Sequence, residues 1–188
     1  MSDKPKFPRA AALDVAREIC AALKPVTRRL IVAGSLRRRK EEVGDVEILF
    51  VPEHWDVGEK TIFTQHDTKT EDTIEKLEMR GILDRRKTVK GSETFGPKNK
   101  LMVHRASSIP VDLFTASEAN WWNYLVCRTG GALSNVAVAT RAREQGYKWN
   151  PYGEGYTRLK DGSIIPMRSE QEVFEFIGLR YLQPWERK

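Results

Sequence analysis

Apolar residues recur along the chain with two spacings, one typical of helices and one typical of strands. Over residues 8–24 they lie three or four positions apart and therefore share one helical face: Ala12, Val15, Ala16, Ile19 and Leu23. Pro25 ends this helix, because proline lacks the backbone N–H that a helix interior needs. Short apolar runs at 30–33 and 46–51 predict two strands joined by a basic turn. The opening of the chain therefore predicts a mixed α/β unit.

The same mixture of elements continues to about residue 118. A helix predicted over 70–80 ends at Gly81. Three further short strands are predicted at 87–89, 100–104 and 111–114. We therefore predict two domains, a mixed α/β one over 1–118 and a smaller one over 119–188.

The second predicted domain is built from short helices and one hairpin. Ser117 and Ser134 are each expected to cap a helix, because a serine hydroxyl accepts a hydrogen bond from a free N–H of the first turn. Asp161-Gly162 predicts a tight hairpin turn. Ser169 with Glu172 has the spacing of a capping box and predicts the start of a last short helix.

Charge and composition restrict the class of partner. The 32 Lys and Arg against 26 Asp and Glu give a net charge of +6, which favours a polyanion such as nucleic acid, although a solvated basic surface explains the same excess. No apolar run approaches the ~20 residues of a membrane span. The 2 Cys cannot build a disulfide framework, so a reducing, cytoplasmic location is expected, which includes a nucleoid or an infected cell. Six basic residues lie within thirteen positions: Arg28, Arg29, Arg37, Arg38, Arg39 and Lys40.

Three carboxylates are the strongest chemical signal. In the strand at 46–51 the alternation of side chains puts Asp45 and Glu47 on one face. Asp112 stands alone in another apolar strand, so the three converge if the two strands are neighbours. Hard oxygen ligands of this kind suit Mg²⁺ or Mn²⁺, whereas the alternative for the pair alone is a solvated strand edge.

The residues before these carboxylates suit a phosphate. Three carboxylates can hold two metal ions ~3.5 to 4 Å apart, the arrangement that catalyses displacement at phosphorus. Gly34-Ser35 at a strand end lets backbone N–H groups and a hydroxyl approach an anion, and Arg37 and Arg38 follow as phosphate partners. The pattern therefore indicates phosphoryl or nucleotidyl transfer.

The chain is similar to family X DNA polymerases, the relatives of polymerase beta. Three segments resemble the nucleotidyltransferase palm of this family: Gly34-Ser35-Leu36-Arg37-Arg38, Gly44-Asp45-Val46-Glu47 and Val111-Asp112-Leu113. Four further features resemble the family's C-terminal nucleotide-binding subdomain: Thr129-Gly130, Asn135, Gly146 and Asn150-Pro151-Tyr152-Gly153. The resemblance extends from about Phe7 to Arg187, and implies an α+β fold in a minimal form, a palm with a mixed sheet plus a small helical and hairpin subdomain.

The resemblance also implies roles for individual residues. Asp45, Glu47 and Asp112 would be the catalytic residues and the ligands of two Mg²⁺ ions, for which Mn²⁺ can substitute. The nucleoside triphosphate would be held by Gly34, Ser35, Arg38, Gly44, Thr129, Gly130 and Asn135. Taken alone, Thr129-Gly130 is an ordinary helix end and Asn135 an ordinary first-turn residue.

The implied activity is that of a monomeric DNA polymerase that adds nucleotides to a 3′-hydroxyl in short gaps of DNA. Phosphate contacts to a gapped or primer–template DNA are expected from basic residues of both predicted domains: Arg37, Arg39, Lys40, Arg141, Arg143 and Lys148. No membrane partner is expected.

Several residues depart from the family pattern. Glu47 stands where the polymerases mostly have Asp, and Cys127 and Arg128 stand where the closest relatives have two aromatics that exclude a ribose 2′-hydroxyl. Val136 and Ala139 take the place of basic residues that face the template. The departures favour two alternatives: a template-independent, RNA-modifying or protein-modifying nucleotidyltransferase, and a non-catalytic nucleic-acid-binding protein.

Overall fold

A computed structural model describes residues 5–53, 68–88 and 91–188. The chain divides into two compact units. Unit 1 comprises Met1–Val32 and Glu41–Thr115, and unit 2 comprises Ala33–Lys40 and Ala116–Lys188. The predicted α+β class is confirmed, since helices accompany a mixed sheet.

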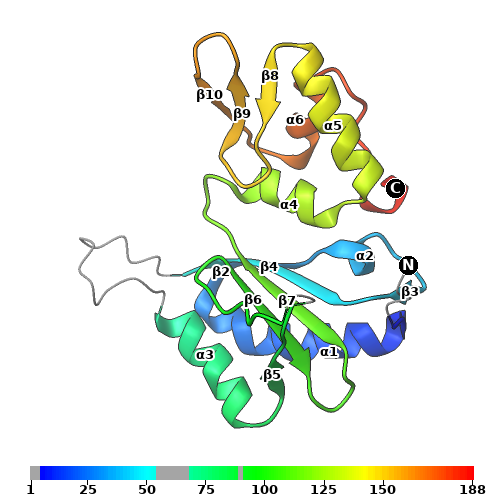
Figure 1. Cartoon of the computed structure of the whole chain (residues 1–188), viewed down its shortest axis with the longest axis vertical. Coiled ribbons are helices and arrows are strands. Elements are labelled where there is room, and N and C mark those ends of the chain that lie inside the picture. Colours follow the sequence, from blue (N-terminus) through cyan, green and yellow to red (C-terminus); the bar gives the residue numbers. More distant parts are fainter. Residues whose placement is uncertain (1–4, 54–67, 89–90) are drawn as a thin grey trace. The chain divides into compact units, whose positions relative to one another are not determined.

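The sheet of unit 1 has five strands in the order β2-β4-β7-β6-β5 (Figure 1). Their bounds are Thr27–Val32 for β2, Val46–Pro52 for β4, Pro110–Thr115 for β7, Asn99–His104 for β6 and Leu83–Arg85 for β5. Strands β4 and β7 are parallel, and the other neighbours are antiparallel. A separate pair joins β1 (Phe7–Pro8) to β3 (Glu42–Val43).

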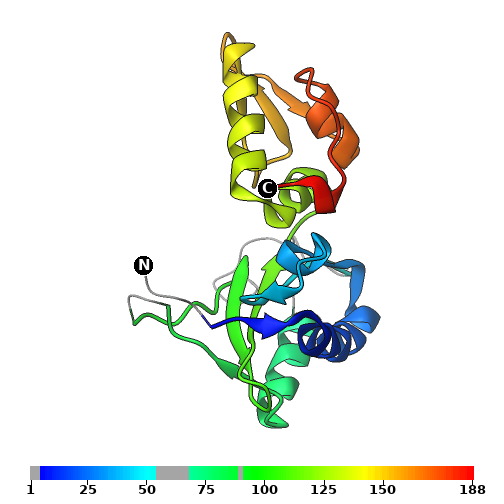
Figure 2. The ribbon, with the colours of Figure 1, turned by 90° about the vertical axis from the view of Figure 1, so that its right-hand side faces the viewer.

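Two helices cover one side of this sheet, as Figure 2 shows for α1 (Arg9–Leu23) and α3 (Thr68–Met79). The apolar face predicted for the first helix is the face that is buried. A single 3-10 turn, η1 (Lys24–Val26), contains Pro25 and leads into β2. The helix α3 is followed by Gly81, whose φ of +70° fits a helix C-terminus.

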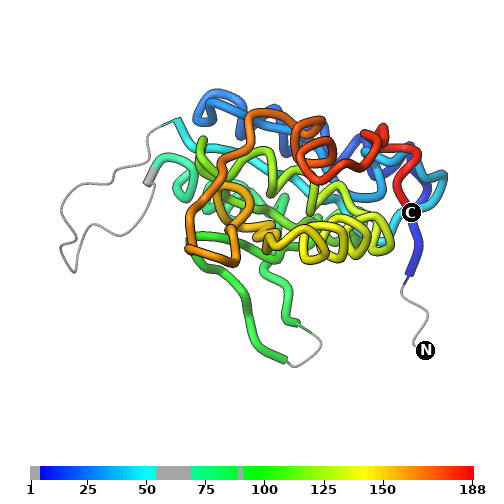
Figure 3. Tube along the Cα trace, turned by 90° about the horizontal axis from the view of Figure 1, so that it is seen from above, coloured from blue at the N-terminus to red at the C-terminus, as the bar shows by residue number. Residues whose placement is uncertain are grey.

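Unit 2 packs helices against a three-stranded sheet, β8 (Tyr147–Trp149), β9 (Gly155–Arg158) and β10 (Ile164–Pro166). Its helices are α2 (Gly34–Arg37), α4 (Trp121–Thr129), α5 (Ala132–Glu144), α6 (Glu170–Glu175) and the 3-10 turn η2 (Pro184–Glu186). Buried residues from these elements form one core: Val126, Val138, Ala142, Trp149, Tyr156, Met167, Val173, Phe174 and Ile177. The chain end returns to the start of α5 (Figure 3), where the Ser134 amide donates to the Lys188 carbonyl at 2.9 Å.

Most predicted elements form, but the two serines predicted to cap helices α4 and α5 do not. The hairpin at Asp161-Gly162 is confirmed, and the Ser169 hydroxyl accepts from the Glu172 amide at 2.9 Å. Ser134 is not a helix cap, because α5 already begins at Ala132. Likewise α4 begins at Trp121 with Asn120 as its N-cap residue, so Ser117 lies outside the helix.

The strand predicted at 87–89 is only partly described. Lys87 forms an isolated bridge to Glu93, and residue 89 lies outside the described residues. The strand β5 was not expected from the sequence, because it has only three residues and lies at the end of the strand order, next to β6. Within the described ranges no helix is long and apolar enough to cross a membrane.

Candidate active site

Two of the three predicted carboxylates are direct neighbours in the sheet of unit 1. Strands β4 and β7 run in parallel with Glu47 opposite Asp112 and Val46 opposite Val111. Side chains opposite each other in a sheet point to the same face, so Glu47 and Asp112 share one face, while Val46 and Val111 are fully buried on the other. Asp45 directly precedes β4. The condition set by the sequence, that the strand of Asp112 lies beside that of Glu47, is met.

A cation that the sequence analysis did not single out lies on this face. The Arg86 guanidinium binds Asp112 with 2.5 Å between Nη2 and Oδ1. The Arg86 Nε also donates to the Met102 carbonyl at 3.4 Å. Asp112 is mostly buried, with 15% of its side chain exposed. In the sequence, Arg86 is only a basic residue next to a predicted strand. Its contact with Asp112 depends on the order of the strands in the sheet, which the sequence pattern does not give.

The donor chemistry of these carboxylates fits a hard divalent cation. Among the residues that the structure describes, no three His, Cys, Asp or Glu side chains gather closely enough to hold a metal ion. Glu47 and Asp112 nevertheless supply carboxylate oxygens from neighbouring strands, which are the ligands that Mg²⁺ prefers. Two neighbouring carboxylates also repel each other unless a cation is near, and Arg86 supplies that positive charge.

Three of the residues predicted to hold phosphates, Gly34, Ser35 and Arg38, lie in or directly after the helix α2 of unit 2. Gly34 opens α2 with a φ of +61°, a value that favours glycine, and Ser35 is partly buried. The Arg38 guanidinium donates through Nη1 to the carbonyl of Thr129. Gly44 belongs to unit 1 and has open space around it, because a Cβ added there would meet no atom within 4 Å. Gly44 therefore leaves space beside its backbone for a ligand.

Three other residues predicted to hold the nucleoside triphosphate lie at the end of α4 and the start of α5. Thr129 is fully buried, and its hydroxyl accepts from Arg37 Nη1 at 2.5 Å. Gly130 has a φ of +65°, and a Cβ there would lie 2.9 Å from Arg38 Nη1. The Asn135 amide donates to the Cys127 carbonyl at 2.9 Å. Its Oδ1 is buried and has no hydrogen-bond partner among the described residues.

A buried ion cluster joins α2 to α6 and to the chain end in unit 2. Both Glu170 carboxylate oxygens bind Arg37, at 2.8 Å from Nη1 and 2.5 Å from Nη2. Glu170 Oε1 also binds Arg187 Nη1 at 2.9 Å, and the Arg187 side chain is completely buried. Burial alone would raise the pKa of the Glu170 carboxyl, but the hydrogen bonds and charges of Arg37 and Arg187 lower this pKa below its ordinary value.

This cluster changes the interpretation of Arg37. The sequence analysis placed it among the DNA contacts, whereas its guanidinium is committed to Glu170 and Thr129 inside unit 2. The same contacts explain why 33–40 groups with unit 2, although the prediction had assigned it to the first domain. Sequence reasoning missed Glu170 because its partners are distant along the chain.

The other basic residues predicted to contact DNA differ in how far their side chains are engaged by other groups of the protein. Arg39 lies over the Trp185 ring at 3.8 Å, and Lys40 is exposed. Arg141 donates to the Ile177 carbonyl at 3.3 Å and binds Glu144, so it is engaged within the protein.

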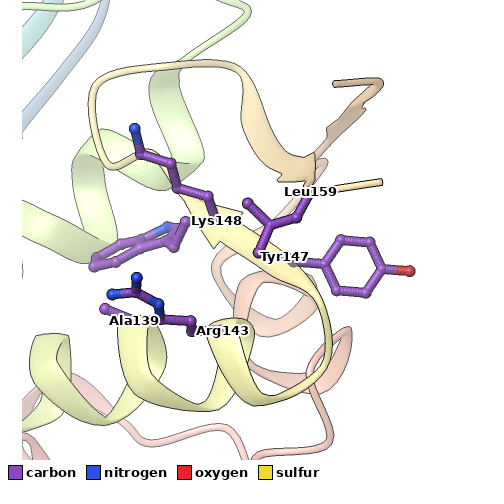
Figure 4. Close-up of a pocket in the computed structure, with 6 residues that line it drawn as sticks. Ala139, Arg143, Tyr147, Lys148 and Leu159 are labelled. Atoms are coloured by element: carbon purple, nitrogen blue, oxygen red, sulfur yellow. The ribbon is translucent and has the colours of Figure 1, made fainter. Parts of the chain in front are cut away.

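Arg143 on α5 and Lys148 on β8 are exposed and line one pocket of about 360 Å³ (Figure 4). The other residues that line it are Ala139, Tyr147, Trp149 and Leu159. No acidic side chain is among these described lining residues, so the pocket combines apolar walls with two positive charges. Positive charges without acidic neighbours attract the phosphates of a polymer.

Comparisons with known proteins agree with the resemblance seen in the sequence. Residues 124–188 match the family model of the DNA polymerase beta thumb. Among solved structures, the chain is similar to Leishmania infantum polymerase beta in a ternary P/T complex, with a TM-score of 0.73 and 20% identity over 98% of this chain and 77% of that chain. A search of curated proteins found no match. The fold is therefore like that of polymerase beta, and the match of residues 124–188 to its thumb confirms the resemblance predicted from the sequence.

Proposed function

We propose that this family X polymerase-like chain is a DNA polymerase that adds nucleotides from a nucleoside triphosphate to a DNA 3′-hydroxyl in short gaps and releases pyrophosphate. One observation supports the proposal most strongly: Glu47 and Asp112 lie opposite each other on parallel strands in a fold like that of polymerase beta, and Asp45 directly precedes the strand of Glu47.

Asp45, Glu47 and Asp112 are the residues that would hold two Mg²⁺ ions. Bound Mg²⁺ would supply positive charge to the phosphates and favour the ionised form of the attacking hydroxyl. Asp112 would receive the proton of the 3′-hydroxyl on a carboxylate oxygen, because an ionised carboxylate accepts protons. Glu47 is one methylene longer than Asp and still offers two oxygens.

Ser35, Arg38 and Gly44 would bind the triphosphate. A guanidinium has five N–H donors, so Arg38 keeps donors for phosphate oxygens beside its bond to the Thr129 carbonyl. The open space next to Gly44 lets an anion approach the backbone. Gly34 would supply the turn that exposes Ser35.

Thr129, Gly130 and Asn135 would contact the nucleoside. Glycine at position 130 lacks a Cβ, which lets the triphosphate-binding Arg38 lie against the backbone beside the proposed nucleoside contacts. The Asn135 amide nitrogen has a second hydrogen besides the one given to Cys127, and the minor-groove edge of every base offers an acceptor.

Sugar discrimination is expected to be weak. Cys127 is small, and the Arg128 side chain extends to Tyr152, with 3.3 Å between Nη2 and the phenol oxygen. We expect kcat/KM for deoxyribonucleotides and ribonucleotides to differ by less than about tenfold, because no aromatic stands at either position to exclude a 2′-hydroxyl. Steady-state kinetics with both nucleotides measure the ratio. A preference above about a thousandfold, or ~4 kcal/mol, would show that another residue excludes the ribose.

DNA affinity is expected to fall steeply with salt. If Arg39, Lys40, Arg143 and Lys148 neutralise about four phosphates, the slope of log K against log salt is about −4. Lys148→Ala should reduce the size of this slope by about one, as measured by fluorescence anisotropy with a gapped duplex. Lys160→Ala is the matched control, because Lys160 is exposed in the β9–β10 turn and lies outside the set. An unchanged slope in Lys148→Ala would exclude this residue from the interface.

Primer extension with and without a template strand tests the proposed function. The proposal predicts that the templated base determines which nucleotide is added to a one-nucleotide gap in the presence of Mg²⁺. Addition of any nucleotide to an untemplated strand would instead favour the terminal-transferase alternative, for which exposed Val136 on α5 is the supporting observation. Absence of extension on every substrate would favour a non-catalytic binding protein.

A further inference from the structure

Arg86 lies in the same row of the unit 1 sheet as the two carboxylates. The Arg86 amide donates to the Leu101 carbonyl at 2.9 Å, so Arg86 continues the pairing of β5 with β6. Leu101 is opposite Asp112, and Asp112 is opposite Glu47. Residues in one row share a face of the sheet, which explains how the Arg86 side chain reaches past Leu101 to Asp112.

The guanidinium is held at two points. Its Nη2 binds Asp112 Oδ1 at 2.5 Å, and its Nε donates to the Met102 carbonyl at 3.4 Å. Both side chains are partly shielded from water, with 31% of Arg86 and 15% of Asp112 exposed. A charge-assisted bond in such a position is stronger and more directional than a pair in open solvent.

We propose that Arg86 is the positioning residue of Asp112 and at the same time limits how tightly the carboxylates bind a divalent cation. The inference rests on the proposed nucleotidyl transfer and adds a residue to it. Arg86 fixes the Asp112 carboxylate by one oxygen, so that the carboxylate keeps one orientation despite the repulsion of Glu47. The same positive charge repels an incoming Mg²⁺, because both cations lie beside one carboxylate.

These two effects have opposite consequences when the charge is removed. In Arg86→Met, which keeps much of the length of the side chain, we expect Mn²⁺ to bind at least about threefold more tightly, because one repelling charge is gone. In the same variant we expect kcat to fall by about tenfold or more with KM for the nucleotide within about threefold, because Asp112 loses its orientation.

Arg86→Lys separates charge from geometry. A lysine keeps the positive charge but lacks the planar fork that binds Asp112 and the Met102 carbonyl together. Its Mn²⁺ affinity should stay within about twofold of that of the unmodified protein, whereas its kcat should recover only in part. Arg85→Met is the matched control, because the adjacent Arg85 binds Glu78 at 2.9 Å and is itself exposed.

The experiment combines Mn²⁺ titration by electron paramagnetic resonance, single-nucleotide gap filling and thermal unfolding of the four proteins. Tighter Mn²⁺ binding with lower kcat in Arg86→Met, and neither change in Arg85→Met, is the predicted result. Equal behaviour of the two Met variants, or weaker Mn²⁺ binding in Arg86→Met at an unchanged thermal midpoint, would overturn the inference. An unmodified protein without activity would contradict the proposed function instead, and the Mn²⁺ titration would still decide the role of the Arg86 charge.

Discussion

Asp112→Asn is expected to lower nucleotide incorporation by about a thousandfold or more, or ~4 kcal/mol of transition-state stabilisation. The amide cannot take the proton of the 3′-hydroxyl and is a weak ligand for Mg²⁺. Its carbonyl oxygen still accepts a hydrogen bond from Arg86, so the local geometry of the sheet is retained. Asp45→Asn and Glu47→Gln should show losses of the same kind.

Single-turnover gap filling measures this loss, and thermal unfolding verifies the fold. Asp84→Asn is the matched control, because Asp84 lies in β5 of the same sheet and binds exposed Arg105 at 2.6 Å. We expect the control to incorporate nucleotides normally and the thermal midpoint of Asp112→Asn not to fall. Robust incorporation by Asp112→Asn would refute its assignment as the proton acceptor and metal ligand.

The second large effect concerns stability. Glu170→Ala should lower the free energy of unfolding by about 3–5 kcal/mol, because it leaves Arg37 and the completely buried Arg187 without their shared counter-charge. Urea unfolding measures the loss. Glu175→Ala, in the same helix but exposed, should change stability by no more than about 0.5 kcal/mol. Similar values for the two variants would show that the cluster contributes little.

The contribution of Glu170 also has a defined pH dependence. Its folded pKa lies below the ordinary value of 4.5, so the charged form is favoured in the folded state. The stabilisation is therefore complete above about pH 4.5 and is lost as the pH falls through the lowered pKa. The difference in stability between the unmodified protein and Glu170→Ala should shrink below pH 4.5. A difference that grows on acidification would contradict the lowered pKa.

Local patterns in the sequence predicted the three carboxylates but not the residues around them. Alternation along 46–51 placed Asp45 and Glu47 on one face, and the lone Asp112 in an apolar strand pointed to a neighbouring strand, because both signals lie within a few residues. The parallel register that puts Glu47 opposite Asp112 is a property of the sheet order and is seen only in the structure.

The contacts that the sequence analysis did not predict join residues far apart along the chain. Arg86 depends on the pairing of β5, β6 and β7, and the short β5 gave no periodic signal. Arg37 follows the predicted phosphate-binding segment Gly34-Ser35 and was therefore expected to contact DNA. Its partner Glu170 belongs to α6, far along the chain. Serine is a common helix cap, but the backbone amide of Ser134 donates to the Lys188 carbonyl at the end of the chain.

The central claim is nucleotidyl transfer, and the pyrophosphate released per nucleotide added tests it most directly. The unmodified protein is incubated with Mg²⁺, one nucleoside triphosphate and a one-nucleotide-gapped duplex, and both products are quantified over time. The account predicts one pyrophosphate for each nucleotide joined to the 3′-hydroxyl, with neither product formed by Asp112→Asn. Release of inorganic phosphate without strand extension, or no reaction of the triphosphate at all, would contradict it.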